Sequence, residues 1–318
     1  MNARRATPGN RDALALAGQR SALLSLHAAV LLFGFAGLFG KWLALSPESI
    51  VLGRTLVASV ALAALLRALR EPYGAFDWKL AAGGAVLALH WVAFFRAVQI
   101  SSVAIGLLGY ASFPLFVLIV EAVLLRRRLR PADWIAVGLV TLGLVLLVPE
   151  FRIQDRIVQG LLWGVFSGLL FALLTVGNRA LAPGRSASGV ALWQNACAAA
   201  CLLPGFVIDP VLPTARDVAL LIVLGVVCTA FAHTLFIRSM RVLSAHTASI
   251  IAALEPVYGI VLAFALLGET PGGRTLLGAA LIIGAALRAS ARQDGSSDDK
   301  ESGRANERKN GQAEHRDG

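Results

Sequence analysis

The stretches YASFPLFVLIVEAVLL (residues 110–125) and AALEPVYGIVLAFALL (residues 252–267) decide how this chain folds, because they are two copies of one hydrophobic pattern. Pro114 and Pro256 occupy the same place in the two copies, 142 residues apart. The same offset pairs further residues around the prolines: Arg96 with Arg238, Ser102 with Ser244, and Leu124 and Leu125 with Leu266 and Leu267. The chain therefore reads as one unit written twice.

Composition places both copies in lipid. Of the 318 residues, 57% are hydrophobic and 15% are charged, whereas about 25% of the residues of a soluble domain are charged. Ten segments are long enough, at roughly 20 residues, to cross the hydrocarbon core of a bilayer as helices. They run over residues 22–44, 49–69, 79–98, 102–125, 132–149, 157–178, 188–208, 217–237, 245–267 and 274–291. The sequence predicts an all-α integral membrane protein with ten transmembrane helices.

Each copy of the unit contains five of these segments. Because five is odd, the second copy enters the bilayer from the opposite side, which makes two inverted five-helix repeats, a plan found in many secondary transporters. The first repeat spans residues 22–149 and the second spans residues 157–291. The flanking residues 1–21 and 292–318 are too polar to bury a core, and the tail is expected to be disordered.

The basic residues indicate the orientation in the membrane. When Lys and Arg are sorted by the alternating sides of the ten spans, fifteen fall on one side and six on the other, before the basic tail is counted. The six are Lys41, Arg96, Arg152, Arg156, Arg216 and Arg274. By the positive-inside rule, both termini are cytoplasmic and the protein is a multi-pass protein of the cell (inner) membrane. The net charge of +10 is then a topology signal, and nucleic acid is not an expected partner.

Glu255 is the acidic residue expected deepest in the bilayer. It lies about ten residues into its segment, roughly 15 Å deep by helix rise, and it directly precedes Pro256. A proline leaves a carbonyl of the preceding turn without a donor and breaks the helix, as we also expect at Pro114. A carboxylate beside loosened backbone is a candidate proton-responsive gate, and a carboxylate that pairs with an Arg or a hydroxyl to lock helices is the alternative.

Other polar and aromatic residues at depth are candidates for a substrate pathway. Arg54 can turn inward to an anionic group or snorkel to the surface, and its counterpart in the second copy is Gln194, next to Trp193. His90, beside Trp91, can hydrogen-bond a substrate or relay a proton. Tyr110 and Tyr258 place a polar tip near each broken helix. Helix packing is the alternative for each of these residues, and for Glu121 the alternative is a salt bridge with Arg126, Arg127 and Arg128.

Signatures of enzymes and metal sites are missing from the sequence. There is no HExxH, P-loop or GxSxG motif and no close pair of membrane aspartates. Cys197, Cys201 and Cys228 lie within predicted spans and lack metal-ligand spacing. We therefore predict no catalytic residue, no cofactor and no metal.

The second copy resembles a known family. Leu254-Glu255-Pro256-Val257, Leu266-Leu267-Gly268-Glu269 and then Gly278 are similar to the signature of EamA-type transporters of the drug/metabolite transporter (DMT) superfamily. The first copy is similar through Phe113-Pro114-Leu115-Phe116, Leu124-Leu125 and Gly138, but it has Arg126-Arg127-Arg128 where the family commonly has an acidic residue. The resemblance implies a ten-helix inner-membrane carrier with a central cavity lined by helices one to four and six to nine.

These observations together predict a secondary active transporter. We expect it to export a small metabolite such as an amino acid by alternating access, with a small-molecule substrate and the lipid bilayer as partners. Proton coupling and a homodimer are left open. The alternatives are a lipid-handling, flippase-like membrane protein and a membrane sensor that does not transport.

Overall fold

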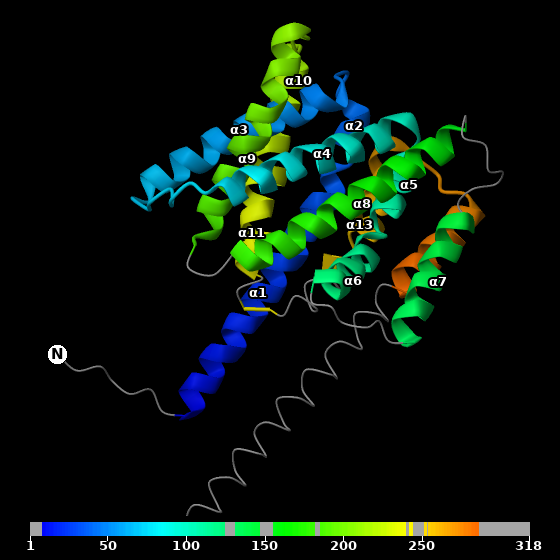
Figure 1. Cartoon of the computed structure of the whole chain (residues 1–318), viewed down its shortest axis with the longest axis horizontal. Coiled ribbons are helices and arrows are strands. Elements are labelled where there is room, and N and C mark those ends of the chain that lie inside the picture. The colour runs from blue at the N-terminus through cyan, green and yellow to red at the C-terminus, as the bar shows by residue number, and fades with distance from the viewer. Residues whose placement is uncertain are drawn as a thin grey trace, which may run out of the picture.

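The computed structural model describes residues 8–124, 131–146, 155–181, 185–239, 242–243, 251–252 and 254–285. Every regular element in these ranges is a helix (Figure 1). The helices of the first half are α1 (Pro8–Ala36), α2 (Phe39–Trp42), α3 (Pro47–Ala68), α4 (Trp78–Ile100), α5 (Val103–Tyr110), α6 (Phe113–Leu124) and α7 (Pro131–Leu146). Those of the second half are α8 (Arg156–Leu181), α9 (Ala187–Ile208), α10 (Ala215–Gly225), the π-helix η1 (Val226–Phe231), α11 (Ala232–Ser239) and α13 (Glu255–Leu267).

Seven helical segments within these ranges are long and apolar enough to cross a membrane. They cover Gly18–Trp42, Pro47–Ala68, Trp78–Ile100, Val103–Val123, Arg156–Arg179, Ala187–Ile208 and Ala215–Ser239. Two shorter apolar helices, Glu255–Leu267 and Gly273–Ala285, and helix α7 overlap the three remaining predicted spans. A helical, multi-pass membrane protein is therefore supported, whereas the division into ten spans and two repeats stays a prediction. Parts of the predicted spans, residues 147–149, 244–250, 253 and 286–291, and the tail from 292 onward lie outside the described residues.

Pro114 and Pro256 both occupy the first turn of a helix. Helix α5 ends at Tyr110, a turn follows, and α6 begins one residue before Pro114. In the same way, α13 begins at Glu255 and Pro256 follows. A proline at such a position costs little, because its missing N–H would find no partner within the helix. The two prolines therefore mark where a helix restarts.

Helices of the two halves pack against each other in a reciprocal pattern. Helix α1 packs against α11 and α13, while α8 packs against α4, α5 and α6. In each case the first helix of one half contacts the third and fourth segments of the other half. Helices α3 and α9, the second of each half, contact each other directly. Figure 1 shows α8 crossing α4 and lying beside α5 and α6.

Glycines allow two of these contacts to be very close. A Cβ atom on Gly164 of α8 would stand 2.9 Å from the carbonyl oxygen of Gly106 and 3.0 Å from Cα of Gly109. A Cβ atom on Gly34 of α1 would stand 2.8 Å from the backbone nitrogen of Gly259 on α13. Backbone therefore meets backbone where α8 touches α5 and where α1 touches α13. Small residues commonly serve this purpose between membrane helices.

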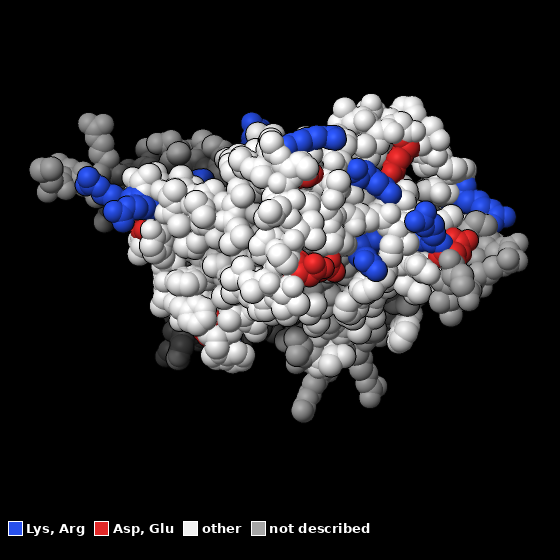
Figure 2. Space-filling model, turned by 90° about the horizontal axis from the view of Figure 1, so that it is seen from above, with Lys and Arg blue, Asp and Glu red and all other residues white. Residues whose placement is uncertain are grey.

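Charged groups lie mainly at the ends of the helices, while many large apolar side chains face outward. Figure 2 shows charged side chains in a few groups separated by wide uncharged areas. Arg179 forms an ion pair with Glu121 at 2.9 Å; Arg126, Arg127 and Arg128, the partners expected for Glu121, lie outside the described residues. Outward residues such as Leu24, which is 71% exposed, are suited to lipid.

Asp77 joins the start of α4 to the segment before α9. Its carboxylate accepts a hydrogen bond from the Lys79 backbone N–H at 3.0 Å and from the Arg185 guanidinium at 2.7 Å. These two bonds, the backbone one first, hold the pKa of Asp77 below its usual value. The interaction ties the two halves together at one end of the bundle.

Adding a methyl group at Gly164 is expected to destabilise the protein. In Gly164→Ala the new Cβ meets backbone atoms that cannot turn aside, and overpacking of this kind costs about 1–3 kcal/mol. Gly177→Ala, in the same helix, is the matched control because nothing lies within 4 Å of its Cβ position. The melting temperature in detergent should fall for Gly164→Ala only. Equal melting temperatures for the two variants would contradict this packing.

Candidate functional site

A small cavity lies at the centre of the bundle. Seven helices line it: α1, α3, α4, α5, α8, α11 and α13. Its volume, counted for the centres of water-sized spheres, is about 40 Å³, which is room for a few water molecules at about 10–15 Å³ each. The lining residues are Phe33, Ala36, Arg54, Leu87, His90, Trp91, Phe94, Tyr110, Phe171, Leu174, Thr175, Asn178, His233, Phe236 and Glu255. The wall is thus mostly aromatic, with a few polar groups.

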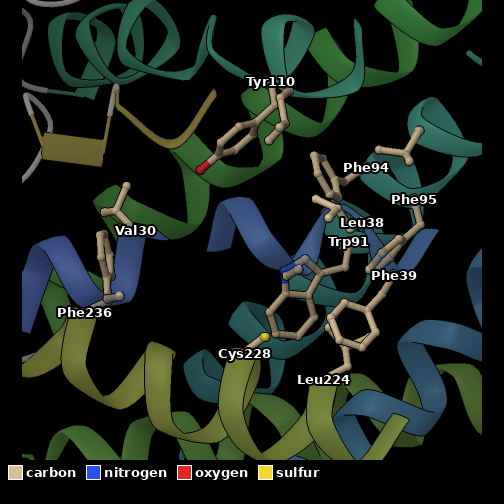
Figure 3. Close-up of a cluster of buried hydrophobic side chains, with 14 of the residues drawn as sticks. Val30, Leu38, Phe39, Trp91, Phe94, Phe95, Tyr110, Leu224, Cys228 and Phe236 are labelled. Atoms are coloured by element: carbon tan, nitrogen blue, oxygen red, sulfur yellow. The ribbon is translucent and has the colours of Figure 1, made fainter. Parts of the chain in front are cut away.

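Arg54 is the buried cation of this cavity. Its side chain projects from α3, and the residue is only 2% exposed. The Nε group donates a hydrogen bond to the Thr229 hydroxyl at 3.0 Å, and Cζ lies 3.9 Å from the ring centroid of Trp91. A guanidinium over an indole is a favourable cation–π contact. Figure 3 shows the indole of Trp91 between Phe39 and Cys228, within the aromatic wall.

Glu255 is the buried carboxylate of the same cavity. It is the first residue of α13 and is 6% exposed. The Tyr110 hydroxyl lies next to its carboxylate. Among the described residues, neither Glu255 nor Arg54 has an ion-pair partner within 4 Å. The cavity therefore holds one group of each charge, and the two are not paired with each other.

Two histidines belong to the cavity wall in different ways. His90 Nδ1 lies 2.8 Å from the Ser167 hydroxyl and 3.0 Å from the Ser167 carbonyl oxygen, so α8 holds the ring of His90. His233 is turned edge-on to Trp91. Its Nδ1 atom is buried and has no hydrogen-bond partner in the described part of the chain. His233 is thus the histidine that still has hydrogen-bonding capacity at the wall.

The structure brings five of the eight predicted pathway residues to the cavity wall: Arg54, His90, Trp91, Tyr110 and Glu255. Gln194 lies behind the wall, where its amide donates to the Asn178 side chain at 2.5 Å. Trp193 lies outside the wall, since its indole N–H donates to the Gly74 carbonyl oxygen at 3.2 Å. Tyr258 is also outside the wall, and its hydroxyl lies 3.2 Å from His27 Nδ1.

Some wall residues were missed by the sequence reasoning although the duplication pointed to them. The offset of 142 residues that pairs the two prolines also pairs Trp91 with His233 and Phe94 with Phe236. All four line the cavity. Thr229 carries no such signal, because its position depends on the π-helix η1, which the hydrophobic pattern does not reveal.

A larger cleft adjoins the cavity at one end. It has a volume of about 400 Å³, lies between α4 and α8, and begins beside Trp78 and Lys79. Leu174 and Asn178 line both the cleft and the cavity. These two side chains therefore stand where the cleft meets the cavity.

Removing the Ser167 hydroxyl is expected to weaken the hold on His90. In addition to its contact with the ring, this hydroxyl donates to the His90 carbonyl oxygen at 3.1 Å, and leaving a buried polar group unsatisfied costs about 1–3 kcal/mol. Ser59→Ala is the control, since the Ser59 hydroxyl bonds only a carbonyl of its own helix. Thermal unfolding should show a clearly lower melting temperature for Ser167→Ala than for Ser59→Ala. Similar values would mean that α8 does not hold His90 through this serine.

Comparison with known proteins gives consistent matches. The model of the EamA-like transporter family matches the chain twice, at residues 20–148 and 158–290. The uncharacterized transporter YwfM of Bacillus subtilis is 28% identical over 260 residues, which cover 78% of this chain and 88% of the relative. The uncharacterized transporter YxxF of the same organism is 23% identical over 273 residues, covering 83% and 87%. An uncharacterized transporter of Archaeoglobus fulgidus is 27% identical over 194 residues, covering 61% and 69%.

A solved crystal structure has the same fold. It superposes with a TM-score of 0.64 at 21% sequence identity, and the match covers 85% of this chain and 98% of the solved one.

Proposed function

The chain belongs to the EamA-like transporter family, and on that premise we propose that it is a secondary active transporter that exports a small metabolite such as an amino acid. Alternating access between two inverted halves is the proposed mechanism. The central cavity is the proposed substrate site, and no residue is assigned a catalytic role.

One observation carries this proposal: a buried cation and a buried carboxylate without ion-pair partners face one cavity inside an apolar bundle. A charged side chain at the centre of a membrane helix costs at least about 2.5–3.5 kcal/mol. Arg54 and Glu255 do not form the ion pair with each other that would reduce this cost. A solute or proton that enters the cavity can compensate the charges in turn, which is what a transport cycle requires.

The contacts between helices support the two inverted halves. Helix α1 packs on α11 and α13 as α8 packs on α4, α5 and α6, and α3 packs on α9. A two-fold axis that relates the halves produces such exchanged pairs and places the second helix of each half beside the other. The two matches of the family model support the same division of the chain.

The cleft beside Trp78 and Lys79 supports loading from one side. In the proposed topology Lys79 belongs to the cytoplasmic side, because most basic residues lie there. Leu174 and Asn178 separate the cleft from the cavity, so a rearrangement of these two side chains opens the cavity toward the cytoplasm. A site closed at one end and adjoined by a cleft at the other suits export from the inner membrane, with both termini cytoplasmic.

Glu255 is the proposed site of proton coupling. It begins a helix just after a break and lies beside the Tyr110 hydroxyl. Taking up a proton removes the charge and with it the cost of holding an ion in a low-dielectric site. Substrate binding and proton release can then alternate at the same place.

Neutralising Glu255 is expected to uncouple transport from the pH gradient. Glu255→Gln keeps the size of the side chain but does not titrate, so exchange of substrate between the two sides should persist while uptake driven by a pH gradient is lost. The assay uses proteoliposomes with an internal pH dye and the twenty standard amino acids as probes. Glu121→Gln is the control, because Glu121 lies in a partly exposed ion pair with Arg179. If Glu255→Gln moves substrate at the normal rate with unchanged pH dependence, the proton-coupling assignment is wrong.

A further inference from the structure

Arg54 is fixed on two sides. Thr229 accepts the hydrogen bond from Nε, and the face of the guanidinium lies on the indole of Trp91. The structure describes no acceptor for either Nη group, and the residue is not within 4 Å of any described carboxylate. Because an arginine keeps its charge in proteins, the Nη edge is a set of donors without acceptors inside an apolar bundle.

A π-helical turn places the Thr229 hydroxyl for this role. Thr229 lies in η1, and its hydroxyl donates to the carbonyl oxygen of Leu224, five residues earlier, at 2.8 Å. A buried threonine in a regular helix instead bonds three or four residues back, as Thr55 does with Val51 and Leu52. With its proton committed to Leu224, the Thr229 oxygen can only accept, and the group that donates to it is Nε of Arg54. Inserted π turns of this kind often occur at functional sites.

The geometry of the free edge selects the kind of group that binds it. Two parallel N–H groups of a guanidinium match the two oxygens of a carboxylate, which gives a bidentate, charge-assisted contact. The cavity holds one Arg and one Glu, so a single negative charge on the ligand is balanced at Arg54. A doubly charged phosphate would bring a second, unbalanced charge into a site with room for only a few water molecules.

We propose that Thr229 and Trp91 hold Arg54 as a receptor for a single carboxylate group of the transported solute. This inference rests on the proposed function, because it names the chemical class of the substrate of the same cavity. The rest of the solute lies against the aromatic wall formed by Phe94, Phe171 and Phe236. Thr229 acts as a positioning residue, since it acts through Arg54.

The test compares carboxylates with their amides. The probes are L-phenylalanine, L-leucine and hexanoate, each paired with its own carboxamide, and inorganic phosphate. Thermal shift and dissociation constants are measured on the full-length protein in detergent. At least one carboxylate should bind tenfold or more tightly than its carboxamide, and phosphate should not compete. If no carboxylate is preferred over its carboxamide, or if phosphate binds more tightly than the carboxylates, the proposal is wrong.

Variants assign the preference to Arg54 and Thr229. Thr229→Val keeps the shape but removes the acceptor, so it should reduce the preference for the carboxylate about tenfold, while Thr229→Ser should restore it. Arg54→Gln should abolish the preference. Thr55→Val is the matched control, because this buried hydroxyl bonds only carbonyls of its own helix. If Thr229→Val keeps the preference as Thr55→Val does, Thr229 has no positioning role.

The outcomes separate this inference from the proposed function. A protein that exchanges amides and carboxylates equally well across proteoliposomes is a transporter whose Arg54 is not a carboxylate receptor. A protein that prefers the carboxylate but shows no exchange has the receptor and is not a transporter.

Discussion

The cost of an ion in a membrane is the constraint that organises this structure. The sequence spends most of its length on apolar helices, and it nevertheless keeps Arg54 and Glu255 almost completely buried. The surrounding groups make this tolerable. The indole of Trp91 and the Thr229 hydroxyl contact the guanidinium, and the Tyr110 hydroxyl lies beside the carboxylate. Each charge is thus partly compensated, and neither is neutralised by an ion pair.

Close backbone packing keeps the cavity small. Where α8 meets α5, Gly164 lies against Gly106 and Gly109, and where α1 meets α13, Gly34 lies against Gly259. Both contacts join helices of different halves, and both lie next to broken segments that begin again at a proline. The same joints bring the aromatic side chains of α1, α4, α8 and α11 to the cavity wall. Movement of one half against the other would have to occur at these two joints.

The sequence predicts the arrangement of the chain better than the details of the site. Helix type, the restarts at Pro114 and Pro256, and the depth of Arg54 follow from apolar runs, from proline chemistry and from the offset of 142 residues. Thr229 could not be found in this way, because a π turn shifts the face of the helix without changing its hydrophobic pattern. Trp193 and Tyr258 show the opposite error: sequence depth placed them near the cavity, but hydrogen bonds to Gly74 and His27 hold them elsewhere.

Access to the cavity from both sides of the membrane tests the central claim most directly. Thr175 lines the cavity, and a single cysteine at this position can report on it once Cys197, Cys201 and Cys228 are replaced. Thr175→Cys is treated with a membrane-impermeant maleimide in right-side-out and in inside-out vesicles. Alternating access predicts labelling from both sides, with a bound substrate changing the two rates in opposite directions. Labelling from one side only, under every condition, would contradict the account.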